Sequence, residues 1–122
     1  MLFWTGAAAR RKGDSMMNML SPEQCRTMTE VRAGVDRTDQ ELVALLARRF
    51  GYMDAAARIK PNRDTVRDEA RKAQVIDNVR RHARAAKIPE GVIAAVWEAL
   101  VEGSIAYEFD RFDALRAEAS AR

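Results

Sequence analysis

The sequence is poor in the residues that build disulfide frameworks, metal clusters and irregular loops. Its 122 residues include one cysteine, Cys25, and one histidine, His82. A single cysteine excludes an internal disulfide and any metal site built from several cysteines, and a single histidine excludes a multi-histidine site. Glycine and proline are also scarce, with 6 and 3 residues. We therefore expect a protein that uses neither a disulfide framework nor a bound metal.

The chain also lacks a long hydrophobic run. No stretch approaches the ~20 apolar residues that a transmembrane helix needs. The apolar residues 1–9 are followed by Arg10, Arg11 and Lys12, whereas a signal peptide carries its positive charges before the apolar stretch. We expect residues 1–18 to form a disordered tail, and we expect a cytoplasmic protein without a membrane partner.

What the chain does contain favours a small helical protein. It has 22 alanines and no β-branched runs, so we predict an all-α fold. The length fits one domain, which we place at residues 19–118. The net charge of +3, with 32% charged residues, is only mildly basic for a dedicated nucleic-acid binder.

Proline and capping signals divide this domain into three predicted helices. Residues 21–24 (Ser-Pro-Glu-Gln) have the pattern of a helix start, and this first helix is predicted to run to about Ile59, because Pro61 disfavours helix in the residue before it. A second helix is predicted from about Thr65 to Ala86. The third begins at Pro89–Glu90 and is expected to fray over residues 117–122. Its predicted apolar face consists of Val92, Ile93, Val96, Trp97, Leu100, Val101, Ile105, Phe109, Phe112 and Leu115.

The first helix is long for so short a chain. About thirty residues from Met28 correspond to ~45 Å. Apolar residues recur along it at spacings of three, four and seven, which is typical of a helix that packs against another helix: Val31, Val35, Leu42, Leu45, Leu46, Met53 and Ala56. This pattern favours a partner helix, most simply from a second copy of the chain.

Charged residues fall on the apolar sides of these helices. Arg49 and Lys60 are eleven residues apart, close to three helical turns, so both point the same way. Arg32 shares that side but lies about 25 Å from Arg49 along the axis, so only a partner chain could bring the two together. The inward faces of the second and third helices add Arg71, Ser104 and Glu108.

A bound dianion would explain this pattern, because an unpaired charge in an apolar seam is costly. The alternative is that each long basic side chain is simply solvated at its tip. A second alternative is a helical scaffold or nucleic-acid-binding bundle that uses the basic segment 80–87. Inward-facing cations favour a small dianion, whereas outward-facing cations favour a phosphate backbone.

Three segments of the first helix resemble the all-helical (AroQ-type) chorismate mutases. They are Val31–Asp39, Leu45–Arg49 and Ala56–Lys60. The family pattern is Arg, then Asp seven residues later, Arg ten later and Lys eleven later, and Arg32, Asp39, Arg49 and Lys60 have that spacing. The second helix resembles the family in residues 66–68 with Arg71, and the third in Ser104 and Glu108.

The resemblance implies an intertwined homodimeric helical bundle that converts chorismate to prephenate without a cofactor. Each site would lie within one chain and be completed by Arg32 of the other. Arg32, Arg49 and Arg71 would hold the two carboxylates of chorismate, and Lys60 and Glu108 would hydrogen-bond the ether oxygen. Ser104 would help to position the substrate, and Asp68 matches a substrate-binding position.

Two features of the sequence bear on the exact reaction. Residues 21–25 and 48–53 resemble the isochorismate pyruvate lyase branch of the family, which forms salicylate, whereas Asp68 and Arg71 match the mutase branch. We therefore predict a chorismate mutase, with the lyase as the alternative. Lys72 occupies a place where many mutases have a glutamate that contacts the substrate hydroxyl, and Glu108 stands where many relatives have glutamine.

Overall fold

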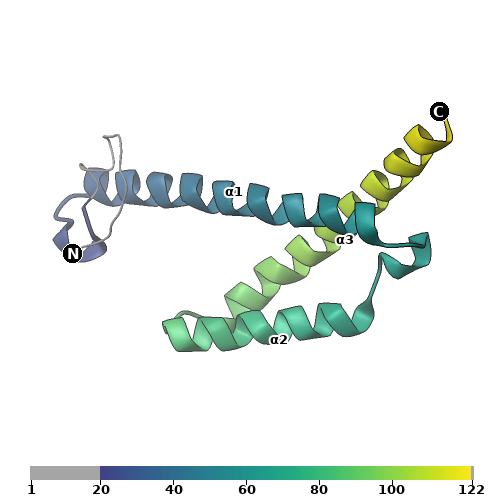
Figure 1. Cartoon of the computed structure of the whole chain (residues 1–122). Helices are drawn as coiled ribbons and strands as arrows, with labels where there is room; N and C mark the ends of the chain where they lie inside the picture. Colours follow the sequence, from purple (N-terminus) through teal and green to yellow (C-terminus); the bar gives the residue numbers. More distant parts are fainter. Residues whose placement is uncertain (1–19, 122) are drawn as a thin grey trace. The chain divides into compact units, whose positions relative to one another are not determined.

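A computed structural model describes residues 20–121, which form three α-helices and two short 3-10 turns (Figure 1). The order is η2 (Pro22–Gln24), α1 (Met28–Ile59), η3 (Arg63–Thr65), α2 (Glu69–Ala86) and α3 (Glu90–Ser120). No strand occurs within residues 20–121, so the prediction of an all-α chain with three helices is confirmed. The expected tail at residues 1–18 lies outside the described residues.

The first helix begins later than the sequence pattern suggested. Pro22–Gln24 forms only a 3-10 turn, in which the Gln24 side chain accepts the Ser21 N–H at 2.9 Å. The cap of α1 is Thr27, whose hydroxyl accepts the Glu30 N–H at 3.2 Å, while Glu30 accepts the Thr27 N–H at 2.9 Å. This reciprocal pair is a capping box, and it was legible in the sequence as Thr-x-x-Glu at residues 27–30. The prediction that one helix runs from Ser21 is therefore wrong.

The second helix also begins later than predicted. Residues 63–65 form the turn η3, and the backbone is extended at Asp68, whose side chain caps α2 by accepting the Arg71 N–H at 2.9 Å. At the other end, Lys87 adopts a left-handed conformation with a φ of 62°, and its N–H returns to carbonyls of the last turn. This geometry is the usual way to end a helix, although glycine is the commoner residue there.

The third helix is longer than predicted, and its apolar residues are unevenly buried. It remains helical to Ser120 where fraying from residue 117 was expected. Its buried residues form one narrow stripe, Ala94, Val101, Ser104, Glu108 and Phe112, whereas Val92 and Val96 are exposed by 60% and 50%. Val92 and Val96, which belong to the predicted apolar face, are thus left exposed within one chain.

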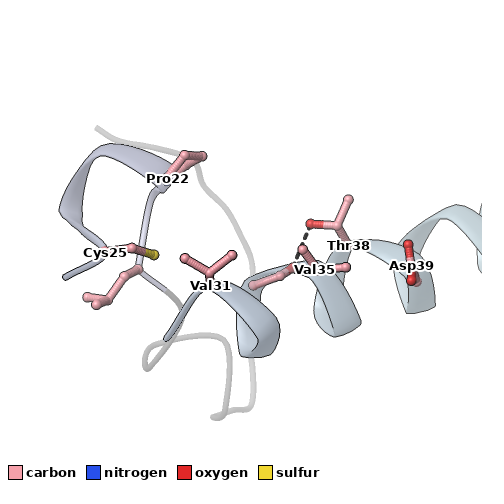
Figure 2. A pocket seen from close by; sticks show the side chains of 8 residues that line it. Pro22, Cys25, Val31, Val35, Thr38 and Asp39 are labelled. Atoms are coloured by element: carbon pink, nitrogen blue, oxygen red, sulfur yellow. Dashed lines mark hydrogen bonds between the residues drawn. The ribbon is translucent and has the colours of Figure 1, made fainter. Parts of the chain in front are cut away.

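The chain divides into two units, which meet within α1 after Ala47. In the first unit, none of residues 20–47 is buried, and six large apolar side chains are exposed: Met28, Val31, Val35, Leu42, Val43 and Leu45. An apolar groove of about 300 Å³ lies between the η2 segment and the first turns of α1. Figure 2 shows Cys25 beside Val31 there, with Thr38 and Asp39 further along the helix.

The second unit, residues 48–121, contains the core. Helices α2 and α3 pack against each other as a helical hairpin (Figure 1). Ala57, Val66 and Phe112 are buried together where α1 ends, with Ile105, Phe109 and Leu115 packed around them. None of the helices in residues 20–121 combines the length and the apolar character that crossing a membrane would require.

Candidate functional site

A cavity of about 310 Å³ lies in the second unit, between the end of α1, the first turn of α2 and the middle of α3. Its walls combine apolar side chains with a cluster of charged and polar ones. The lining residues are Arg49, Met53, Ala56, Lys60, Val66, Asp68, Arg71, Lys72, Val101, Ser104, Ile105 and Glu108.

Arg49 enters the cavity from α1 and is held by α3. Its Nη1 donates to Ser104 Oγ at 2.8 Å, and that hydroxyl donates in turn to the Leu100 carbonyl at 2.7 Å. Ser104 is only 3% exposed, so its one hydroxyl proton is committed to the backbone and its oxygen is left to accept from Arg49. The serine therefore fixes the guanidinium without neutralising it.

Lys60 and Glu108 form the second polar pair. The Lys60 ammonium donates to the Val66 carbonyl at 3.2 Å and lies 2.8 Å from Glu108 Oε2. That oxygen is buried, and the Lys60 contact lacks hydrogen-bond geometry, so Oε2 accepts no hydrogen bond from residues 20–121. The contact is therefore an ion pair without a hydrogen bond. A buried carboxyl oxygen with unused hydrogen-bonding capacity is costly unless a further group meets it.

Arg71 brings a second guanidinium to the cavity. Its backbone N–H is capped by Asp68, and its Nη1 donates to Gln74 at 2.7 Å. Neither Arg49 nor Arg71 forms an ion pair with any carboxylate in the part of the chain described here. Burial, and secondly the positive charge of Arg71, lower the pKa of Arg49 from its ordinary value. The two arginines thus carry positive charge that no carboxylate of residues 20–121 neutralises.

Lys72, the fourth cation, is neutralised from α3. Its ammonium lies 2.5 Å from Glu98 and 2.8 Å from Glu102, and Glu102 also receives Arg67 at 2.6 Å. Hydrogen bonds from Arg67 and then from Lys72 lower the pKa of Glu102 to about 2. This group of ion pairs, which we call the Glu102 brace, ties the first turn of α2 to α3 beside the cavity.

The cavity can therefore bind a small molecule with two negative charges. Arginine is the side chain best suited to bind a carboxylate through two parallel hydrogen bonds. Two arginines without carboxylate partners match two ligand carboxylates, and Lys60 with Glu108 can contact a polar atom between them. Among residues 20–121, no group of three or more His, Cys, Asp or Glu side chains could hold a metal ion.

The structure brings most of the predicted site residues together. Arg49, Lys60, Asp68, Arg71, Ser104 and Glu108 all line the one cavity. Arg32 does not, since it lies in the first unit. Lys72 lines the cavity as well, but its partners Glu98 and Glu102 were missed. In the sequence, the two glutamates are marked only by their spacing of four residues, which places them on one side of a helix. This spacing does not reveal which neighbouring helix that side faces.

The basic segment of α2 lies elsewhere and is partly neutralised. Arg80, Arg81, Arg84 and Lys87 are exposed. Arg81 pairs with Asp77 and also contacts Asn78, and Arg84 contacts both carboxylate oxygens of Glu90. The cations of this segment point to solvent, whereas those of the cavity point inward.

Comparison with known proteins gives two findings. A family model described as chorismate mutase type II matches residues 31–109, about two thirds of the chain. An isochorismate pyruvate lyase of Pseudomonas aeruginosa is similar to this chain, with 29% identity over 93 residues, covering 73% of this chain and 92% of the relative.

The Glu102 brace should make stability depend on acid pH. A carboxylate whose pKa is lowered in the folded state stabilises the fold above its ordinary pKa, and this contribution is lost as the pH falls toward the folded value. We expect Glu102→Gln to lower the urea midpoint at about pH 6, and the difference from the unaltered protein to shrink by about pH 3. Asp36→Asn, at an exposed carboxylate without an ion pair in residues 20–121, is the control. An equal difference at both pH values would contradict the assignment.

Proposed function

This chain belongs to the chorismate mutase type II family, and we propose that it converts chorismate to prephenate in the cavity of the second unit. The observation that carries the proposal is the charge of that cavity. Arg49 and Arg71 line it and have no carboxylate partner within residues 20–121, and chorismate offers two carboxylates. The reaction breaks an ether C–O bond and forms a C–C bond within one molecule, so it requires no nucleophile.

In this proposal the arginines select a conformation of the substrate. Arg49, fixed by Ser104, and Arg71, on the first turn of α2, hold the carboxylates so that the two reacting carbon atoms lie close together. Holding reacting atoms in a near-attack geometry removes entropy that the reaction in solution must lose. Asp68 contributes by capping the helix turn that carries Arg71.

Lys60 and Glu108 act on the ether oxygen. Negative charge develops there as the C–O bond breaks, and donors already directed at that atom stabilise the transition state more than the ground state. The Lys60 ammonium is one donor. Glu108 can donate only when it carries a proton, because an ionised carboxylate is solely an acceptor. Its Oε2 is buried beside Lys60 and accepts no hydrogen bond within residues 20–121, so this carboxyl group has hydrogen-bonding capacity left for a ligand.

We further propose that the active form is a homodimer, with Arg32 of one chain completing the site of the other. Residues 20–47 bury no side chain, although they carry six exposed large apolar residues and the apolar groove of Figure 2. Leaving so much apolar surface in water is unfavourable, and a second copy would cover it. Arg32 lies on the same stretch of helix and does not line its own chain's cavity.

Release of pyruvate from isochorismate, which forms salicylate, is the alternative reaction. The similarity to an isochorismate pyruvate lyase of Pseudomonas aeruginosa favours it. We rank the mutase first because Asp68 and Arg71 match mutase positions and both line the cavity. A nucleic-acid-binding role is less well supported, since the exposed segment 80–87 is partly neutralised by its own carboxylates.

An assay of the purified protein with each substrate tests the function. We expect prephenate to form from chorismate with a kcat/KM higher than that for pyruvate release from isochorismate. Arg49→Ala should lower kcat/KM by at least about 100-fold, because it removes a charged contact to the substrate. A higher kcat/KM for pyruvate release would reverse the ranking, and activity with neither substrate would refute the proposal.

Replacement of Glu108 tests its role as a hydrogen-bond donor. Glu108→Gln keeps the size of the side chain and donates through its amide, so it should retain activity, whereas Glu108→Ala should not. The measurement is kcat/KM of both variants for prephenate formation. Equal losses in the two variants would show that donation by this side chain is not required.

Mixed dimers test the role of Arg32. Arg32→Ala and Arg49→Ala chains should each be nearly inactive alone. If Arg32 acts on the partner's site, a heterodimer has one site with both substitutions and one site with neither, so mixing should restore activity. Heterodimers verified by native mass spectrometry that show no recovery would count against this arrangement, as would a fully active monomer in light scattering.

A further inference from the structure

The carbonyl groups at the C-terminal end of α1 are capped in an uncommon way. The last four carbonyls of a helix lack partners within the helix, and a glycine in left-handed conformation usually follows to satisfy some of them. Here α1 ends at Ile59, and Lys60 is followed by Pro61, which has no N–H to donate. A donor for these carbonyls must therefore be a side chain or water.

Arg116 of α3 supplies a donor for one of these carbonyls and another for the carbonyl that follows the helix. Its Nη1 donates to the Ala57 carbonyl at 3.0 Å, and its Nη2 donates to the Lys60 carbonyl at 2.6 Å. The flat face of the same guanidinium lies over the Phe112 ring, 3.8 Å from the centroid. Only arginine combines two rigidly spaced donors with a planar face that stacks on an aromatic ring. Its positive charge is also favourable at the negative end of the helix dipole.

The contact with Arg116 helps to hold Lys60, which is fixed at its N–H, its carbonyl and its ammonium. Its N–H donates to the Ala56 carbonyl at 2.9 Å, and its carbonyl accepts from Arg116. Its ammonium donates to the Val66 carbonyl and lies beside Glu108. A lysine side chain has four rotatable bonds, so a fixed backbone is needed for its tip to remain at one place in the cavity.

The spacing on α3 links these contacts. Ser104, Glu108, Phe112 and Arg116 follow one another at intervals of four residues, so they lie along one face of the helix. Successively they hold Arg49, face the Lys60 ammonium, build the core and bind the Lys60 carbonyl. One helix face thus sets the position of both cations that α1 brings to the cavity.

We propose that Arg116 is a positioning residue for Lys60, acting through the backbone at the end of α1. This inference rests on the proposed function of Lys60. Displacement of a catalytic group by about 1 Å can cost on the order of 100-fold in rate. The loss should therefore appear in the chemical step and not only in the stability of the fold.

The experiment compares two arginines of α3. Arg116→Met keeps a long apolar side chain but removes the donors and the charge. Arg111→Met is the matched control, because Arg111 also reaches from α3 to α1, where it lies 3.2 Å from Asp54. At a temperature where both proteins are fully folded, we expect Arg116→Met to lower kcat for prephenate formation at least about tenfold, with KM changed less than about threefold. Arg111→Met should change neither by more than about threefold.

Amide hydrogen exchange gives a second readout that does not depend on turnover. Exchange at residues 57–60 should be faster in Arg116→Met than in Arg111→Met, with the rest of the chain unchanged. Arg116→Lys, which keeps the charge but not the two-pronged geometry, provides the same comparison with less disturbance of packing. If these variants match the control in kcat and in exchange, the inference about Arg116 is wrong. Lys60→Ala separates the two proposals, because an unimpaired kcat in that variant would instead refute the role of Lys60.

Discussion

Two arginines without a carboxylate partner in the described residues, Arg49 and Arg71, are the constraint around which the cavity is organised. Burial, and secondly the charge of Arg71, lower the pKa of Arg49, so the chain holds positive charge where it is costly. It nevertheless has carboxylates available nearby. Glu108 is paired with Lys60, and Glu98 and Glu102 with Lys72. The lysines are thus neutralised and the arginines are not, which reserves the better carboxylate-binding groups for a ligand.

The sequence predicted the features that depend on local chemistry. Pro61 and Pro89 bound the helices because proline lacks an N–H and restricts its neighbour, and this effect needs no tertiary information. Arg49 and Lys60 share a helix face because their spacing equals three turns. The start of α1 was misplaced because Ser21–Gln24 and Thr27–Glu30 both match a capping pattern. Choosing between two such signals requires knowledge of where the chain packs.

The features that sequence reasoning missed are contacts between helices. Glu102 and Arg116 are ordinary charged residues on α3, and nothing in their spacing reveals that one meets Lys72 and the other caps α1. The exposure of Val92 and Val96 has the same origin, because an apolar periodicity records which face can be buried and not whether a neighbour covers it. The core of the second unit is small, with Ala57, Val66 and Phe112 at its centre, so polar contacts carry much of the orientation of α3.

The unneutralised arginines have a consequence for work in solution. A cavity that carries excess positive charge will attract whatever small anion the medium contains, and phosphate and sulfate resemble a carboxylate in charge and hydrogen bonding. Such ions would compete with the substrate, while ionic strength would separately weaken the long-range attraction that brings a dianion to the cavity. Dissolved salt would also screen the exposed ion pairs of the Glu102 brace. The choice of buffer anion should therefore change the apparent Michaelis constant of this protein, because a bound anion must leave before the substrate can bind.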